Sequence, residues 1–279
     1  MVKTTFEQYR GELLKTGGYT TPEERRSPVR AKPGALTTLR FSLRASRVFP
    51  LCALYELFGM LTQERWARFC FSTVQVAEAM GMNVLVEGFK NRAGYDGPVI
   101  YLCNHMSTFE TILLPTILQA YGDFNTVVKA SLSHLPFLEK AAVSIGLVPV
   151  SRKSPKEDLM NILKVGVDCL NSGKSFLVFP QGSREKTFSR RMYSSIGAKL
   201  AERAKVPVCP IVVDTRCQPT REKGLLAKVF KDFGPVDTSK DVRCCCGPMI
   251  RAEKSREMHE AAFDWMAGKL EDWGLPVER

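Results

Sequence analysis

The sequence predicts an α/β fold, with a mixed, largely parallel sheet flanked by helices and an N-terminal helical hairpin in front of it. From residue 83 onward, short apolar runs alternate with helical runs, which is typical of a largely parallel sheet covered on both faces. Residues 35–82 instead show helical periodicity with many aromatic and basic side chains. The length of 279 residues suits one sizeable core with an appendage.

The chain divides into three predicted parts. Residues 1–34 are polar and interrupted by glycine and proline, so we expect a loosely packed leader with one short helix near residues 4–15. Residues 35–82 are predicted to form the hairpin, with a break between Gly59 and Thr62. Residues 83–279 are predicted to form the α/β domain.

The elements of the α/β domain follow from its apolar runs. Short runs predict strands at 83–88, 98–103, 124–129, 147–151, 175–180, 206–213 and 242–248. Longer amphipathic segments between them predict helices at 108–121, 135–145, 155–172, 194–204 and 254–272.

The composition limits which kinds of binding partner are expected and indicates the redox state of the compartment. The net charge of +11 favours an anionic partner, namely a nucleic acid, an anionic membrane surface or a phosphorylated substrate. We expect no nucleic acid, because the sequence has no zinc finger, basic zipper or RNA-binding aromatic motif. The nine cysteines include no C-x-x-C pair, so we expect no metal and a reducing compartment.

The hairpin has two interpretations. No stretch of about twenty apolar residues is present to cross a bilayer, and the run from Val48 to Met60 is interrupted by Pro50 and Glu56. A basic, aromatic helix pair of this kind is typical of a helix lying in the membrane interface. Alternatively, the two helices only pack on the α/β domain. Residues 1–34 contain no apolar core of a signal peptide.

His105 is the strongest candidate for chemistry. It follows the predicted strand 98–103 and precedes the helix at 108–121, and such strand-to-helix turns commonly carry the active sites of α/β sheets. Glu110, in the first turn of that helix, is placed to accept a proton from one ring nitrogen and leave the other as a base. Alternatively, Ser107-x-x-Glu110 is only a capping box at the start of the helix.

A second group of candidates suits an anion. The strand 175–180 ends in Gly182, which permits a sharp bend, and Arg184, whose planar guanidinium suits a phosphate. Lys129 and Arg152 end two other strands, and parallel strands would bring both to the edge that carries His105. The alternative is that these are ordinary turns with solvated charges.

Four stretches together resemble the glycerolipid acyltransferases, the family of 1-acyl-glycerol-3-phosphate acyltransferases. The first is Asn104-His105-x4-Glu110, where the family's commonest form ends in Asp. The second block is Lys129, Pro136, Gly146 and Val150-x-Arg152. The third is Phe179-Pro180-Gln181-Gly182-Ser183-Arg184, usually F-P-E-G-T-R, and the fourth is Val206-Pro207-Val208-Cys209-Pro210-Ile211. The matches run in the family's order over residues 83–253.

The resemblance implies a glycerol-3-phosphate acyltransferase-like fold and transfer of a fatty acyl group from acyl-CoA or acyl-ACP to a lysophospholipid hydroxyl. The most favoured acceptor is 1-acyl-glycerol-3-phosphate, in phospholipid biosynthesis. His105 and Glu110 would be the catalytic residues. Substrate-binding residues would be Lys129, Arg152, Gly182, Ser183 and Arg184.

The resemblance also implies an enzyme without a cofactor or metal, docked on the cytoplasmic face of a membrane as a peripheral or monotopic protein. Gln181, which stands where the family has Glu, removes a charge from the third motif. This departure keeps two alternatives open: an acyltransferase-like membrane-binding protein without turnover, or an acyltransferase acting on another lysolipid.

Overall fold

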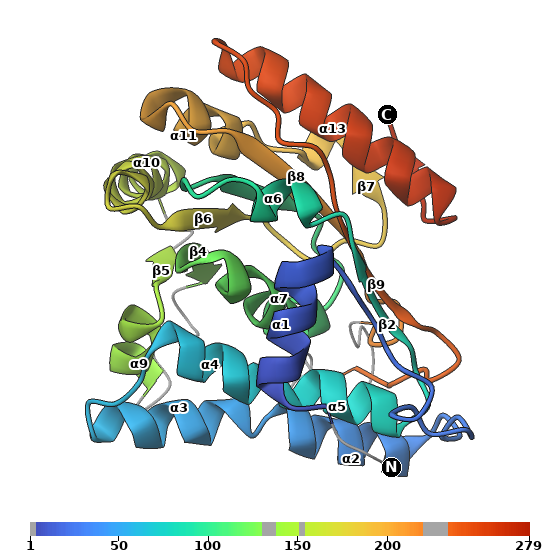
Figure 1. Cartoon of the computed structure of the whole chain (residues 1–279). Helices are drawn as coiled ribbons and strands as arrows, with labels where there is room; N and C mark the ends of the chain where they lie inside the picture. Colours follow the sequence, from blue (N-terminus) through green and yellow to red (C-terminus); the bar gives the residue numbers. More distant parts are fainter. Residues whose placement is uncertain (1–3, 130–137, 151–153, 220–233) are drawn as a thin grey trace.

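A computed structural model describes residues 4–129, 138–150, 154–219 and 234–279 of the chain. A central sheet separates two groups of helices, as Figure 1 shows. One group lies on one face of the sheet and includes α10 (Pro155–Asn171), α11 (Ile196–Ala204) and α13 (Ser255–Asp272). The predicted α/β class is therefore confirmed.

The sheet has eight strands in the order β1-β2-β9-β8-β3-β6-β4-β5. The strands that pair in parallel around its centre are β3 (Ile100–Cys103), β4 (Phe124–Lys129), β5 (Leu147–Val150), β6 (Ser175–Val178) and β8 (Val208–Asp214). On the other side of β8, β9 (Val242–Cys246) is antiparallel to β8, and β2 (Val84–Glu87) is parallel to β9. The sheet is thus mixed and largely parallel, as predicted.

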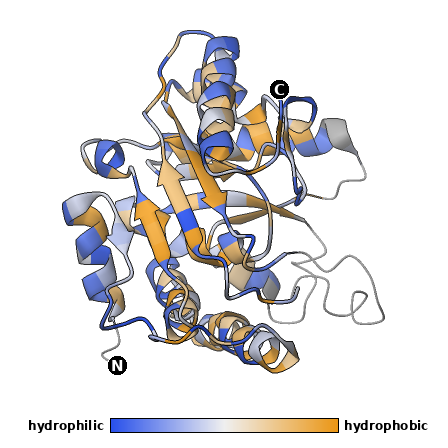
Figure 2. Ribbon diagram, turned by 90° about the vertical axis from the view of Figure 1, so that its right-hand side faces the viewer, coloured by the Kyte–Doolittle hydropathy of each residue, from blue (hydrophilic) through white to orange (hydrophobic). Residues whose placement is uncertain are grey.

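Side chains of the central strands are buried on both faces, because helices cover both. In Figure 2 these strands have the hydrophobic colour along most of their length. One apolar core lies under α10, α11 and α13 and includes Phe176 and Phe263. The other core, on the opposite face, includes Tyr101, Phe109 and Phe124. Continuous apolar runs such as 100–103 are the expected signature of such doubly covered strands.

The second group of helices covers the other face. The main helix after β3 is α7 (Phe109–Leu118), which continues into the 3-10 turn η1 (Gln119–Tyr121). The same face carries α9 (Leu138–Ser144). Each predicted strand and helix of the α/β domain has its counterpart within a few residues. Very short elements were not predicted, because they are too short to show periodicity: α6 (Lys90–Ala93), β7 (Phe188–Ser189), η2 (Arg190–Met192) and β10 (Val277–Glu278).

The hairpin region folds as two arms separated by residues 58–62, close to the predicted break. Each arm is itself broken into two helices: α2 (Ala35–Ala45) with α3 (Val48–Leu57), and α4 (Gln63–Cys70) with α5 (Ser72–Ala79). The arm of α4 and α5 packs towards α7, and the arm of α2 and α3 lies outside it (Figure 1). No helix in the described ranges is long and apolar enough to span a bilayer.

The prediction of a loosely packed leader is wrong. Helix α1 (Phe6–Thr16) buries Tyr9 and Leu13 completely, and its start is closed by a capping box between Thr5 and Gln8. Strand β1 (Tyr19–Thr20) then pairs antiparallel with β2 and so extends the sheet. The polar composition of residues 1–34 concealed these few large apolar side chains, whose burial outweighs the cost of ordering the segment.

Candidate active site

The order of the strands brings the candidate residues together. Strand β3 lies between β8 and β6, and all three run in the same direction. Their carboxyl ends therefore meet at one edge of the sheet, where open α/β sheets bind ligands. His105 follows β3, Thr215 follows β8, and the loop from Phe179 to Thr187 follows β6. Residues from three distant parts of the sequence thus form one site.

His105 and Glu110 are in direct contact. Nδ1 of His105 lies 2.9 Å from Oε1 of Glu110, and the exposed fractions of the two side chains are 17% and 0%. The imidazole also stacks on the ring of Phe179, with ring centroids 4.4 Å apart. A carboxylate at Nδ1 holds the proton on that nitrogen and leaves Nε2 as the basic atom. This is the arrangement expected of a general base.

The Glu110 carboxylate is held by several further donors. Oε1 accepts hydrogen bonds of 2.6 Å from the backbone N–H groups of Met106 and Ser107. Oε2 lies 2.6 Å from the Ser107 hydroxyl and accepts a hydrogen bond of 2.7 Å from the Thr215 hydroxyl. Burial would raise the pKa of Glu110, but the hydrogen bond and charge of His105 and the Ser107 hydrogen bonds outweigh it and lower that pKa. Glu110 is thus held ionised.

The two interpretations of Ser107-x-x-Glu110 prove compatible. Half of a capping box is present, because Glu110 reaches back to the Ser107 N–H. The Ser107 hydroxyl accepts from the Phe109 N–H at 3.0 Å, two residues on, rather than from the third helical amide. Glu110 therefore closes the start of α7 and orients His105 with the same carboxylate.

Asn104, the first residue of the motif, joins β3 to β8. Its Nδ2 donates to the carbonyl of Val213 at 2.9 Å, and its Oδ1 accepts from the Val213 N–H at 2.8 Å. With 2% of its surface exposed, Asn104 extends the ladder between the strands by one side chain. It fixes the backbone immediately before His105 and does not point to a ligand.

The loop after β6 turns sharply next to His105. Gly182 adopts a positive φ of 68°, and its N–H donates to the Phe179 carbonyl at 2.9 Å. That N–H therefore closes the turn. Arg184 donates from Nη1 to the Thr108 hydroxyl at 2.7 Å, which places its guanidinium at the start of α7 beside the His105 loop. Ser183 donates to Glu185 at 2.8 Å.

Of the two other predicted substrate-binding residues, the structure describes only the backbone of Lys129. Lys129 ends β4, and Val150 opposite it ends β5, so both strand ends lie at the edge that carries His105. The side chain of Lys129 and the whole of Arg152 lie outside the described residues.

Arg190, which follows the third motif, pairs with Glu260 and Asp264 on α13. Arg190 thus connects the segment after the third motif to α13 through ion pairs.

Two site residues were missed by the sequence analysis. Thr215 is fully buried and contacts both Glu110 and Ser107. Its place two residues after the predicted strand 206–213 was the available signal, since neighbouring parallel strands end at one edge. Gln181 was noted for the charge that it removes, and not for the contact that its side chain makes with the backbone of His105. Among the described residues, no group of three or more His, Cys, Asp and Glu side chains is arranged to hold a metal ion.

Comparison with known proteins shows which family this part of the chain resembles. Residues 83–214 match the family model described as Acyltransferase. The 1-acyl-sn-glycerol-3-phosphate acyltransferase of Pseudomonas aeruginosa is 30% identical over 148 residues, which are 53% of this chain and 55% of that protein. A chloroplastic 1-acyl-sn-glycerol-3-phosphate acyltransferase of Arabidopsis thaliana is 27% identical, over 50% of this chain and 39% of that protein. The matched region thus spans about half or less of these relatives.

A solved structure resembles almost the whole fold. The 1-acyl-sn-glycerophosphate acyltransferase PlsC of Thermotoga maritima superposes with a TM-score of 0.64 at 17% identity, covering 86% of this chain and 95% of that one. The similarity in fold therefore extends beyond residues 83–214 matched by the family model. Residues 83–214, with the His105–Glu110 pair near their start, belong to the acyltransferase family, and their relatives include 1-acyl-sn-glycerol-3-phosphate acyltransferases.

Proposed function

We propose that this protein is an O-acyltransferase that moves a fatty acyl group from a thioester to the free hydroxyl of a lysophospholipid. The observation that carries this proposal is the contact of 2.9 Å between His105 and the buried carboxylate of Glu110. A base with an ionised, fully hydrogen-bonded orienting group suits removal of a proton from a hydroxyl. The names of the relatives support 1-acyl-glycerol-3-phosphate as the acceptor.

In the proposed step, His105 and the two substrates account for every proton and bond that changes. Nε2 of His105 takes the proton from the acceptor hydroxyl while that oxygen attacks the thioester carbonyl. The carbon–sulfur bond then breaks, and the imidazolium returns its proton to the leaving thiolate. A positioned base of this kind contributes a factor of about 10²–10⁴ to the rate. Glu110 stabilises the imidazolium during the step.

We propose that the acceptor's phosphate lies on the Arg184 side of the site. The guanidinium is anchored to Thr108 at 2.7 Å, so it has a fixed place at the start of α7. The positive end of a helix and a planar guanidinium both favour a phosphate. Lys129, Arg152, Gly182 and Ser183 remain proposed contributors. The thioester donor is proposed to be acyl-CoA or acyl-ACP.

We propose that the outer arm of the hairpin lies on an anionic membrane surface, on the cytoplasmic side. The exposed fractions of Leu36, Leu39 and Leu43, which share one face of α2, are 60%, 54% and 60%. Exposed arginines accompany them on the same arm, namely Arg40, Arg44 and Arg47. Apolar side chains beside cations are typical of an interfacial helix. All nine cysteines are free thiols, which suits a reducing compartment.

An assay of acyl transfer tests the proposal. Labelled acyl-CoA and acyl-ACP would be supplied with lysophosphatidate, other lysophospholipids, amino-acid lysolipids and glycerol-3-phosphate. We expect transfer to lysophosphatidate that is lost in His105→Ala. A wild-type protein that is folded and inert with every pair would favour the alternative, an acyltransferase-like membrane-binding protein without turnover. Transfer to a different lysolipid would keep the mechanism and change the acceptor.

A further inference from the structure

Gln181 joins two backbone segments of the site through its side chain. Its Oε1 accepts a hydrogen bond from the His105 N–H at 3.1 Å, and its Nε2 donates to the Thr187 carbonyl at 3.3 Å. The residue is 4% exposed, so water competes little for these contacts. The loop after β6 also binds the other side of His105, because the Glu185 N–H donates to the His105 carbonyl at 2.8 Å. Both backbone polar groups of His105 are thus held by one loop.

The two partners of Gln181 determine which side chain suits this position. The His105 N–H needs an acceptor, and the Thr187 carbonyl needs a donor. A primary amide offers one of each, whereas an ionised carboxylate offers only acceptors. We propose that Gln181 is a positioning residue that fixes the backbone of His105, and that this chain requires an amide rather than a carboxylate there. Only the effect of this contact on catalysis rests on the proposed function.

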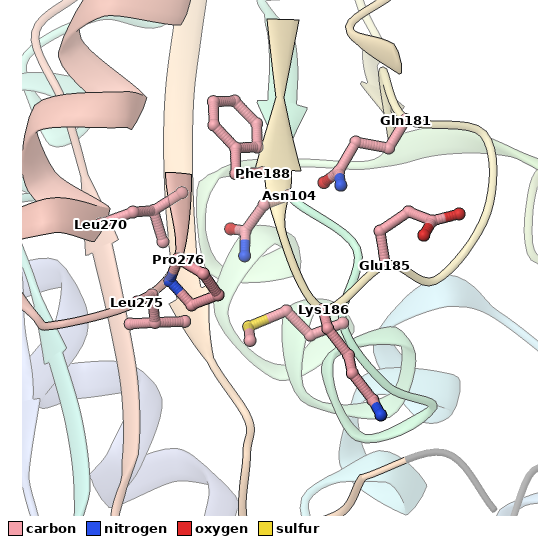
Figure 3. Close-up of a pocket in the computed structure, with 9 residues that line it drawn as sticks. Asn104, Gln181, Glu185, Lys186, Phe188, Leu270, Leu275 and Pro276 are labelled. Carbon is pink, nitrogen blue, oxygen red and sulfur yellow. The ribbon is translucent and has the colours of Figure 1, made fainter. Parts of the chain in front are cut away.

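The surroundings of Gln181 favour a rigid contact. Figure 3 shows its side chain beside a cavity that is also lined by Asn104 and by the C-terminal residues Leu275 and Pro276. The cavity has a volume of about 10 Å³, which is too small for an acyl chain or a phosphate group. The C-terminal segment lines one side of the cavity and is bonded to β7 directly after the loop, since the Phe188 N–H donates to the Pro276 carbonyl at 3.0 Å. Gln181 therefore has little room to move away from His105.

The direct test is to replace the amide by a carboxyl and by an apolar chain of similar length, with Gln181→Glu and Gln181→Met. At pH 8 the introduced carboxylate would be ionised and would face the Thr187 carbonyl, so the contact should break. We expect kcat to fall by about 10- to 100-fold with KM nearly unchanged, because a displaced base slows the chemical step. The charged or titratable groups beside position 181 include Glu185 and Lys186, which line the same cavity, and the ring of His105, whose backbone Gln181 contacts.

Gln63 provides a matched control. It is 5% exposed and also uses both halves of its amide, donating to the Phe124 carbonyl at 2.8 Å and accepting from the Phe124 N–H at 2.9 Å. Phe124 begins β4, so this contact lies at the opposite edge of the parallel strands from His105. Gln63→Glu should lower the melting temperature as Gln181→Glu does. It should leave kcat of the folded protein unchanged.

The pH profile separates positioning from general destabilisation. Once protonated, the carboxyl introduced by Gln181→Glu can donate to Thr187 and accept from His105, so the kcat ratio of this variant to wild type should rise as the pH falls. The ratio for Gln181→Met should stay low at every pH. A ratio near one for Gln181→Glu at pH 8, or equal losses of kcat in Gln63→Glu, would overturn the proposal.

Hydrogen exchange tests the contact between Gln181 and His105 without relying on catalytic activity. The backbone amide of His105 should exchange at least about tenfold faster in Gln181→Met than in wild type, because it loses its acceptor. The same amide should be unaffected in Gln63→Glu. If wild type transfers no acyl group but the exchange result holds, the proposed function fails and the positioning contact stands. Unchanged exchange at His105 in Gln181→Met would contradict the contact itself.

Discussion

Thr215 donates a hydrogen bond of 2.7 Å to the carboxylate of Glu110, although the two residues are 105 positions apart in the chain. The contact connects the residue after β8 to the first turn of α7, at the point where α7 also holds His105 through Glu110. Thr215 is fully buried. The orientation of the proposed base is therefore set by a residue from a different strand.

Thr215→Val should weaken both the fold and the activity. Valine keeps the shape but removes the hydroxyl, which leaves one oxygen of a buried carboxylate with fewer donors. We expect the free energy of unfolding to fall by about 1–3 kcal/mol, measured by urea denaturation, and kcat to fall about tenfold. Thr215→Ser keeps the hydroxyl and should stay close to wild type in both. Equal behaviour of the two variants would show that the hydroxyl is unimportant.

His105→Ala should separate catalysis from stability. The ring is partly exposed and its removal leaves Glu110 with four other hydrogen-bond contacts. We expect kcat to fall by about 10²–10⁴ with a melting temperature within a few degrees of wild type. Steady-state kinetics and calorimetry provide the two readouts. Retained transfer in this variant would mean that another group is the base.

Glu110→Gln tests whether the carboxylate acts through its charge. The amide has similar size but cannot stabilise an imidazolium as an anion does, so kcat should fall about 10²-fold or more. If activity persists while the melting temperature drops, Glu110 only closes the start of α7. Glu56→Gln, on the outer arm of the hairpin, is a control for the loss of one carboxylate.

The stability contributed by Glu110 should depend on pH in a definite direction. Its pKa is depressed in the folded protein, so its contribution is fully present above the unfolded carboxyl's pKa of about 4.3 and is lost as the pH falls through the folded value. The difference in unfolding free energy between wild type and Glu110→Gln should therefore be constant near neutrality and shrink in acid. Urea denaturation over this range measures it. A difference that grows in acid would contradict the assignment.

Replacing Leu36, Leu39 and Leu43 together by Gln should weaken membrane binding. If each side chain buries about half of its surface in the interface, each contributes about 1 kcal/mol, or roughly a fivefold change in partitioning. Flotation with vesicles containing anionic lipid measures the effect. Met160→Gln on α10, where Met160 is 59% exposed, is the control. Unchanged flotation of the triple variant would remove α2 from the docking surface.

Local patterns in the sequence were enough to predict most of the fold. The apolar runs at 98–103 and 175–180 correspond to β3 and β6, because strands covered on both faces need such runs. The pairing of His105 with Glu110 was also predictable, since five residues across a strand-to-helix turn allow the contact that one helix would forbid. In contrast, Tyr9 and Leu13 lie in a polar segment, where their helical spacing predicts a short helix but does not indicate which part of the core buries them.

The sequence by itself determined the succession of strands and helices along the chain, the expected pairing of His105 with Glu110 and the resemblance to acyltransferases, because each of these follows from short stretches of neighbouring residues. Only the tertiary structure decided that Thr215 holds Glu110 and that Gln181 holds His105. Those contacts depend on β3 lying between β8 and β6. The burial of large apolar surfaces over the whole sheet fixes that order, and no local spacing encodes it.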